Sequence, residues 1–554
     1  MVVDILGFMS RAMRIVKIGF LLHLISAIAS SAIAQTRIPQ DSVLLQGCRH
    51  VDSFRICHQL ILRKQQQEID QLLRLELNYG HWTDNHATKA NECLVPTTQN
   101  VFLASAEVMV LNAGVWIFDL YLLKGDYARI NIHSIQDNFR TGFVWDNDGF
   151  NTNLFAHPYH GSLYFNAARA NGMNFWESIP FAIGGSLSWE FIFENEPAAI
   201  NDLLSTSIGG SCIGEITWRL SDLIVDNSAR GMNRVAREAG ILLLSPMRGM
   251  NRIISGESWK KGSCTNTTID FPKMVFSVGL NYRLFAKTNN WRYEANGAEI
   301  DLHFIYGNPM SDFENIPYSF FTLDAKLNFF DQQPIIGSFR AKALLSGIQI
   351  RKGTNVNLLL GIFQHFNFQD SDPIDHTSEV TPYEISEAAA FGIGGLCQFP
   401  FLEKFAFFCD LYLNGVLLGG SYTDYYRVVD RDYNLGSGYS MLLLPGISWR
   451  RIGELRLSAE RIQLFSWKGY DKGTDFQKMS HQEMLHLNAQ GDKGNTALST
   501  FAIQLKINLI KSEIGKLQIS LSLIYYLRNT HYSYFPDVDY GVSESKIGII
   551  YRIE

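Results

Sequence analysis

The C-terminal half of the chain alternates apolar and polar residues with a period of two. In residues 501–509 the odd-numbered positions are apolar, whereas Gln504, Lys506 and Asn508 are polar. The same alternation recurs in residues 517–528 and in the final stretch, residues 546–553. Because successive side chains of a strand point to opposite faces, this pattern predicts strands with one apolar and one polar face.

About twelve segments of this half are long enough to cross a bilayer as a tilted strand, which takes roughly 9–11 residues. They are residues 273–286, 291–306, 318–330, 337–351, 356–367, 385–399, 405–420, 437–451, 454–466, 496–510, 516–529 and 541–553.

Short connections between these segments alternate with long ones. The short ones are 352–355, 400–404, 452–453 and 511–515, and the long ones are 368–384, 421–436, 467–495 and 530–540. The first hairpins break the rule, since 287–290 is short and 307–317 is long. Alternating loop lengths are typical of an up-and-down barrel with its long loops at one end. We therefore expect an antiparallel transmembrane β-barrel of about 12 strands in residues 270–554. A soluble β-sandwich is the alternative.

Residues 100–260 repeat their apolar positions with helical spacing instead and predict three or four helices, so the fold class is α+β. Residues 102–123 are apolar apart from Glu107, Asn112 and Asp119. This stretch suits either a buried helix or a poor membrane span, and we interpret it as buried. A polar N-terminal segment, residues 35–99, precedes the helices.

The N-terminus has the features of an export signal. Arg11, Arg14 and Lys17 precede an apolar run, residues 18–28, which leads to the small-residue site Ala32-Ile33-Ala34. A basic region, a short apolar region and an A-x-A site define a secretory signal peptide. We expect residues 1–34 to be removed.

Composition narrows the class further. Of the 554 residues 46% are hydrophobic and 18% charged, and the net charge is −6. The chain is too apolar to be disordered and has no basic excess for binding nucleic acid. Its seven cysteines include no C-x-x-C pair and suggest no zinc site. We expect no cofactor and no metal.

A polar cluster between residues 140 and 222 interrupts the apolar helices, and burying such residues is costly unless they are paired. Two histidines three residues apart, with carboxylates on the next helix, are residue types suited to a general base or a metal site. Ser186, Glu190 and Glu194 are spaced to share one helical face. The candidates for catalysis are His157, His160, Glu190, Glu194 and Asp202.

The same region suits a structural network, which is the interpretation we favour. Pro158 indicates a turn or helix start that can point the two histidines apart, and Asp202 suits the first turn of a helix. Glu215 and Arg219 are spaced as a helical ion pair, and paired glycines such as Gly209-Gly210 allow close helix crossing. The expected network residues are Asp146, Asp148, Arg169, Ser186, Glu196, Glu215 and Arg219.

Two runs, HPYHGSLYFNAARANG from His157 and SLSWEFIFENEPAAINDLLSTSIGGSCIGE from Ser186, resemble the signature of a bacterial family known only as domain of unknown function 3943. The segments Trp145–Asp148 and Gly361–Asn367, with Asp370–Asp372 after them, fit the same pattern, so the resemblance spans most of residues 100–400. Ala198-Ala199 departs from it. The resemblance implies an exported outer-membrane protein of Gram-negative, Bacteroidetes-type bacteria, and it implies no activity.

Two function classes follow. In the first, the protein is an outer-membrane barrel that the helices plug or brace, with a transport, assembly or structural role and the lipid bilayer as its partner. In the second, it is a membrane-embedded hydrolase or acyltransferase acting on lipid or cell-wall material. There His157 or His160 is the base, and Glu190, Glu194 or Asp202 is its partner.

Overall fold

The computed structural model describes residues 99–553, apart from 146–147, 261–272, 288–292, 311–314, 330–332, 353–355, 375–380, 403, 427–431, 450–451, 476–477, 481–482, 484–488 and 513–514. The expected signal peptide and most of the polar N-terminal segment lie outside the described residues.

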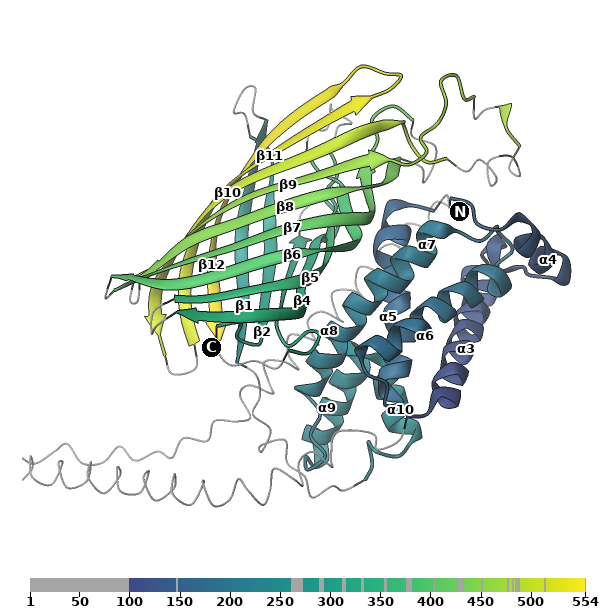
Figure 1. Ribbon diagram of the computed structural model, residues 1–554, viewed down its shortest axis with the longest axis horizontal. Helices are drawn as coiled ribbons and strands as arrows, with labels where there is room; N and C mark the ends of the chain where they lie inside the picture. Colours follow the sequence, from purple (N-terminus) through teal and green to yellow (C-terminus); the bar gives the residue numbers. More distant parts are fainter. Residues whose placement is uncertain are drawn as a thin grey trace, which may run out of the picture. The chain divides into compact units, whose positions relative to one another are not determined.

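The C-terminal half forms a closed antiparallel barrel of twelve strands, in which each strand pairs with the next and β1 pairs with β12 (Figure 1). The strands are β1 Met274–Lys287, β2 Tyr293–Tyr306, β3 Phe321–Phe329, β4 Ile336–Lys352, β5 Val356–Gln369, β6 Ile385–Leu402, β7 Phe405–Tyr422, β8 Tyr433–Trp449, β9 Gly453–Ser466, β10 Gly494–Lys511, β11 Gly515–Tyr532 and β12 Val538–Ile553. The predicted barrel is confirmed, and its closure excludes the sandwich.

The wall of the barrel has two chemically different faces. Large apolar side chains are exposed on its outer face, among them Leu280, Ile393 and Leu523, each about 60% exposed. The alternate positions face the lumen, and many of them are polar and buried, such as Asn281, Asn414 and Ser522. An apolar exterior around a polar interior is the architecture of outer-membrane barrels, because lipid contacts only the outside.

The long second connection, between β2 and β3, has a structural explanation. β3 pairs with β4 only as far as Ala343, which leaves the next residues of β4 without a neighbouring strand on that side. The connection satisfies them instead. The Tyr318 amide donates to the Leu344 carbonyl at 2.6 Å, and the Gly347 amide donates to Asn315 Oδ1 at 2.9 Å. The long connection therefore seals an edge that lipid could not.

The helical region contains more and shorter helices than the three or four expected. They are α3 Val101–Phe118, α4 Ile132–Thr141, α5 His157–Ala170, α6 Phe175–Ser188, α7 Ile200–Leu204, α8 Gly210–Asp222, α9 Gly231–Leu244 and α10 Pro246–Ile254. Four π-helical turns adjoin them: η2 Asp119–Leu123, η4 Thr152–Ala156, η5 Trp189–Phe193 and η6 Ser205–Gly209. Such turns often occur at functional positions of helices.

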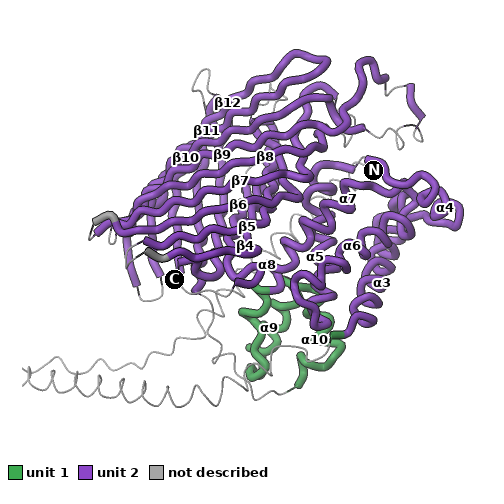
Figure 2. The backbone as a smooth tube through the Cα atoms, viewed as in Figure 1, with its two compact units in different colours: residues 1–99, 219–271 green, residues 100–218, 272–554 purple. Residues whose placement is uncertain are grey.

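The chain divides into two compact units (Figure 2). Residues 100–218 and 272–554 form one unit, and residues 1–99 and 219–271 form the other. The described part of the second unit includes α9 and α10, which Arg252 joins by an ion pair to Glu238 at 2.8 Å. Arg219 belongs to this unit.

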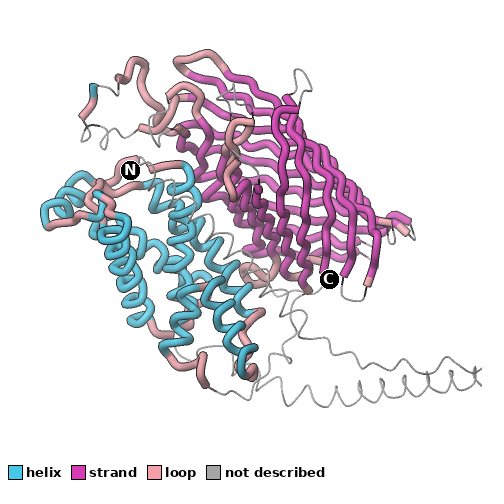
Figure 3. Tube along the Cα trace, turned by 180° about the vertical axis from the view of Figure 1, so that it is seen from behind, coloured by secondary structure: helices cyan, strands magenta, loops and turns pink. Residues whose placement is uncertain are grey.

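Within the larger unit, the helices of residues 100–218, here called the helical bundle, pack against the outside of the barrel (Figure 3). Gln364 Nε2 donates to the Ile208 carbonyl at 2.9 Å, and Asn153 Nδ2 donates to Tyr433 Oη at 2.6 Å. The ring of Phe155 lies 5.1 Å from that of Phe368 and 5.9 Å from that of Phe339.

All the barrel residues in these contacts face outward. Gln364 and Phe368 alternate in step with Leu360 and Ile362, which are 45% and 52% exposed on the outer face. Phe339 is opposite Phe368 in the β4–β5 register and so shares its side. We call Phe339, Gln364, Phe368, Gly420 and Tyr433 the docking patch. These contacts lie on the outer face of the wall, so they contradict the expectation that the helices plug the barrel.

The apolar stretch expected to be a buried helix is largely exposed. The helix Val101–Leu123 has the length and hydropathy of a membrane span, and only 17% of its most apolar window is buried. Phe102 and Val110 are 85% and 70% exposed. The interpretation as a buried helix was wrong. The sequence of an apolar helix has the same pattern whether protein or lipid surrounds the helix.

Candidate functional site

His157 is the first residue of α5, directly after the η4 turn. Its Nε2 lies 3.7 Å from Asp202 Oδ1, and the two side chains are 15% and 5% exposed. Asp202 also accepts a hydrogen bond from Asn201 Nδ2 at 2.8 Å. The structure therefore brings one predicted histidine and one predicted carboxylate together, at a distance that suits electrostatic attraction more than a hydrogen bond.

His160, one turn further along α5, faces a different environment. Its ring lies 4.7 Å from that of Tyr164 and 5.5 Å from that of Trp189. Its Nε2 is buried and has no hydrogen-bond partner. The two histidines thus do not converge on one point.

Glu190 and Glu194 lie at the end of the next helix. Glu190 is only 1% exposed, and its Oε2 accepts the Ala199 amide at 2.7 Å. The helix ends at Phe193, so Glu194 has an extended backbone. The prediction that Ser186, Glu190 and Glu194 share one face is wrong for Glu194, because the η5 turn interrupts the regular helical spacing.

Arg169 and Glu215 form a buried ion pair between α5 and α8. Arg169 Nε lies 3.0 Å from Glu215 Oε2, Arg169 Nη2 lies 3.3 Å from Oε1, and Glu215 is fully buried. Glu215 thus has a partner on another helix, Arg169, which the sequence placed in the same expected network. Asp148 supplies its carbonyl to Tyr433 Oη at 2.9 Å, Ser186 is buried, and Glu196 is half-buried. Asp146 lies outside the described residues.

Glycines set how closely these helices approach. A Cβ on Gly161 would lie 1.8 Å from the Thr206 carbonyl oxygen, and one on Gly210 would lie 2.6 Å from Gly161 Cα. These backbones touch where α5 crosses η6 and α8, which is the use of small residues common in membrane helix pairs.

Sequence reasoning missed the polar centre of the helical bundle. Asn112 of α3 is fully buried and donates from Nδ2 to Ser188 Oγ at 2.7 Å and to the Gly185 carbonyl at 3.1 Å. Its Oδ1 accepts the Tyr164 hydroxyl. Asn138 of α4 likewise donates to the carbonyls of Glu190 and Glu194. The available signal was a lone asparagine inside an apolar helix.

Sequence reasoning also missed a cluster of paired charges on the lumen face of the barrel. Arg283 pairs with Glu544 and, at 2.9 Å, with Glu299, and it donates to Tyr383 Oη at 3.0 Å. Lys546 contacts both carboxylates. Arg283, Glu299 and Glu544 are all at most 1% exposed. These pairs cross-link β1, β2 and β12 through the lumen.

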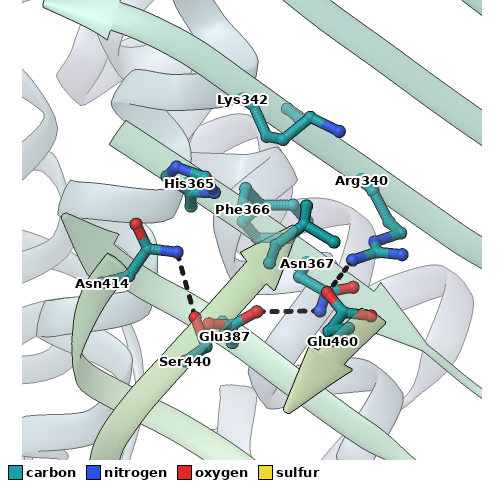
Figure 4. A pocket seen from close by; sticks show the side chains of 11 residues that line it. Arg340, Lys342, His365, Phe366, Asn367, Glu387, Asn414, Ser440 and Glu460 are labelled. Atoms are coloured by element: carbon teal, nitrogen blue, oxygen red, sulfur yellow. Dashed lines mark hydrogen bonds and ion pairs between the residues drawn. The ribbon is translucent and has the colours of Figure 1, made fainter. Parts of the chain in front are cut away.

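A small cavity lies in this lumen (Figure 4). Arg340 pairs with Glu460, Asn367 donates to Glu387 at 2.8 Å, and Asn414 donates to Ser440 at 3.0 Å. The cavity holds about one water molecule.

An acidic group borders the loop after β5. Burial, and secondly the neighbouring Asp372, raise the pKa of Asp370 to about 7, and Asn151 of the helical bundle donates a hydrogen bond to it. Burial, and secondly the neighbouring carboxylates Asp370 and Asp432, also raise the pKa of Glu384. Nowhere in the described part of the chain do three or more His, Cys, Asp or Glu residues assemble into a group that could hold a metal ion.

The closed, outwardly apolar barrel defines the class: an outer-membrane β-barrel with a helical bundle docked on its wall. The family model described as "Domain of unknown function (DUF3943)" matches residues 142–247. This confirms the resemblance within the helical region, over a shorter range than the expected residues 100–400. No curated protein matches the chain.

Several solved outer-membrane barrels are similar to about half of the chain. The NanC porin is 9% identical, with 49% of this chain and 98% of that chain covered, at a TM-score of 0.23. The Pseudomonas putida toluene transporter TodX is 7% identical, with 51% and 89% covered, at 0.20. The translocator domain of the autotransporter NalP from Neisseria meningitidis is 10% identical, with 55% and 95% covered, at 0.22. The assignment of the barrel rests on its own strand order.

Proposed function

We propose that the protein is a closed outer-membrane barrel whose helical bundle braces the outer wall, with a structural or assembly role in the envelope. The observation that carries the proposal is where the polar groups of the helical bundle find their partners. Glu190, Asp202 and Glu215 each accept from within the bundle, and Gln364 of the docking patch donates to the bundle's Ile208 carbonyl.

The lumen supports a closed barrel over an open diffusion pore. A pore needs a water-filled interior, whereas the charges here are buried and paired. Arg283 pairs with Glu299 and Glu544 on the two adjacent strands, and Arg340 of β4 pairs with Glu460 of β9 across the lumen. Removing one partner of such a pair leaves an uncompensated charge, so the network resists opening.

Conductance across a planar lipid bilayer tests this function. We expect the purified protein, inserted in its heat-modifiable barrel form, to give no steady ohmic steps. A porin inserted under the same conditions provides the positive control. Reproducible steps of fixed size from the wild-type chain would overturn the closed barrel and restore a transport role.

A second candidate function is a membrane-embedded hydrolase or acyltransferase, and the His157–Asp202 pair favours it. His157 keeps some exposure beside a buried carboxylate, which is the arrangement of a base and its orienting partner. Its test is release of fatty acid from phospholipid or lipopolysaccharide by the full chain. Activity that His157→Ala and Asp202→Asn abolish, and that His160→Ala retains, would establish this function.

A further inference from the structure

We propose that α3 and the adjoining η2 turn lie in the bilayer beside the barrel, with their exposed face against lipid acyl chains. The proposal rests on the helical bundle being docked on the outer wall, as in the proposed function. The helix would then be a second membrane-embedded element, beside the strands that cross the membrane.

The first argument is length. The apolar helix Val101–Leu123 has 23 residues, and at 1.5 Å per residue it is about 34 Å long. The hydrocarbon core of a bilayer is about 30 Å thick. A helix of this length with a mean hydropathy of 1.8 matches that thickness.

The second argument is the direction of its polar side chains. The three polar interruptions of the apolar stretch each have a partner in the helical bundle. Asn171 Nδ2 donates to Glu107 at 2.9 Å, Asn112 bonds to Ser188 and Tyr164, and Asp119 bonds to Tyr127. Polar residues of membrane helices face the protein interior in this way, because lipid offers them no hydrogen bond.

The third argument is the exposed face itself. Its large side chains are apolar and far from buried: Phe102, Val110, Ile117, Phe118, Tyr121 and Leu122 are between 49% and 85% exposed. In water such a surface would be unfavourable, since contiguous apolar patches of this kind mark a partner or a membrane.

The fourth argument identifies the occupant as lipid. The bundle covers only one end of the docking-patch strands, and the same strands continue into open, lipid-facing residues. On β5, Gln364 and Phe368 are covered, whereas Leu360 and Ile362, on the same face, are exposed. The helical bundle therefore adjoins the surface that the barrel presents to lipid, and α3 packs on α5 and α6 of that bundle.

Photo-crosslinking in whole outer membranes tests the proposal. Benzoylphenylalanine replaces Val110 or Leu122 on the helix, Ile393 or Leu523 on the barrel, and Tyr534 in the turn between β11 and β12. With radiolabelled acyl chains, we expect lipid adducts at positions 110 and 122 in yields within about twofold of those at 393 and 523, and far less at 534.

The outcomes separate this proposal from the proposed function. Lipid adducts at 393 but not at 110 overturn the proposal and leave the barrel in the membrane. Adducts of position 110 with another protein chain, with a second copy or with the chain's own N-terminal segment also overturn it. Loss of lipid adducts at 393 as well overturns the membrane location of the barrel itself.

A substitution supplies an independent readout. Val110→Arg places a charge on the exposed face, and in the bilayer we expect the ratio of folded to unfolded protein to fall about 100-fold. Val110→Leu, at the same position, should leave the ratio within about twofold. Equal stability of the two variants in lipid vesicles would contradict a lipid-facing position.

Discussion

The barrel and the helical bundle solve the same problem of polar groups in an apolar surrounding, by different means. The barrel pairs a group of charges on its lumen face, where Arg283, Glu299, Glu544 and Lys546 neutralise one another. Around α3 the bundle relies on uncharged hydrogen bonds, with Asn112 bonded to Tyr164 and Ser188, and it holds one buried ion pair, Arg169–Glu215, between α5 and α8. Neighbouring strands of a barrel can place opposite charges side by side on the lumen face. Polar side chains of helices in contact with lipid are more often paired with uncharged groups. This difference predicts that substitutions can unfold the bundle without unfolding the barrel.

The largest effect should come from breaking the lumen network. Arg283→Ala leaves two buried carboxylates with one fewer cation, which should cost about 3–5 kcal/mol of unfolding free energy in lipid vesicles. Arg461→Ala is the matched control, because Arg461 sits on the exterior and bonds to Ser499. It should cost less than about 1 kcal/mol. Equal losses in the two variants would refute the importance of the lumen pairs.

Breaking the centre of the helical bundle should have the next largest effect and should spare the barrel. Asn112→Leu leaves the Tyr164 hydroxyl without its acceptor, at a cost of about 2–3 kcal/mol. We expect the bundle to become sensitive to protease while the barrel keeps its heat-modifiable migration on gels. Gln136→Leu, at an exposed position of α4, should change stability by less than about 0.5 kcal/mol. Simultaneous loss of barrel and bundle would show that the regions are one cooperative unit.

Disturbing the docking patch should have a smaller effect, and two glycines of β7 offer a matched pair. Both face outward, but a Cβ on Gly420 would meet Leu154 of the bundle at 2.3 Å, whereas one on Gly415 would find no atom closer than 3.9 Å. Gly420→Leu should therefore cost about 1–3 kcal/mol by overpacking. Gly415→Leu should be near neutral, as measured by the thermal midpoint of bundle unfolding. Identical midpoints for the two variants would argue against the patch.

The barrel was predictable from sequence because one physical constraint acts on every strand. Lipid outside and a polar lumen inside impose period two, so segments such as 501–509 and 546–553 reveal both the strands and their faces. The order of the strands follows, because neighbours in sequence pair.

The position of the helices was not predictable, because the relevant residues look alike in either setting. Phe339 and Phe368 are apolar and outward, as residues facing lipid or a docked helix both are. Val101–Leu123 is apolar whether lipid or protein covers it. The lumen pairs depend on register, since Arg283 and Glu544 are 261 residues apart. Glu194 does not share the helical face of Ser186 and Glu190, because sequence spacing does not reveal the π-helical turn that precedes it.

The most direct test of the central claim, that the helical bundle lies outside the barrel wall, is a disulfide across the docking patch. In a background without the native cysteines, Leu154→Cys is combined with Gly420→Cys, which faces outward, or with the adjacent Ser421→Cys, which faces the lumen. Our account predicts that oxidation in intact membranes cross-links the 154–420 pair and leaves the 154–421 pair free. Cross-linking of 154 to 421 in preference to 420 would place the helices inside the barrel and contradict the account.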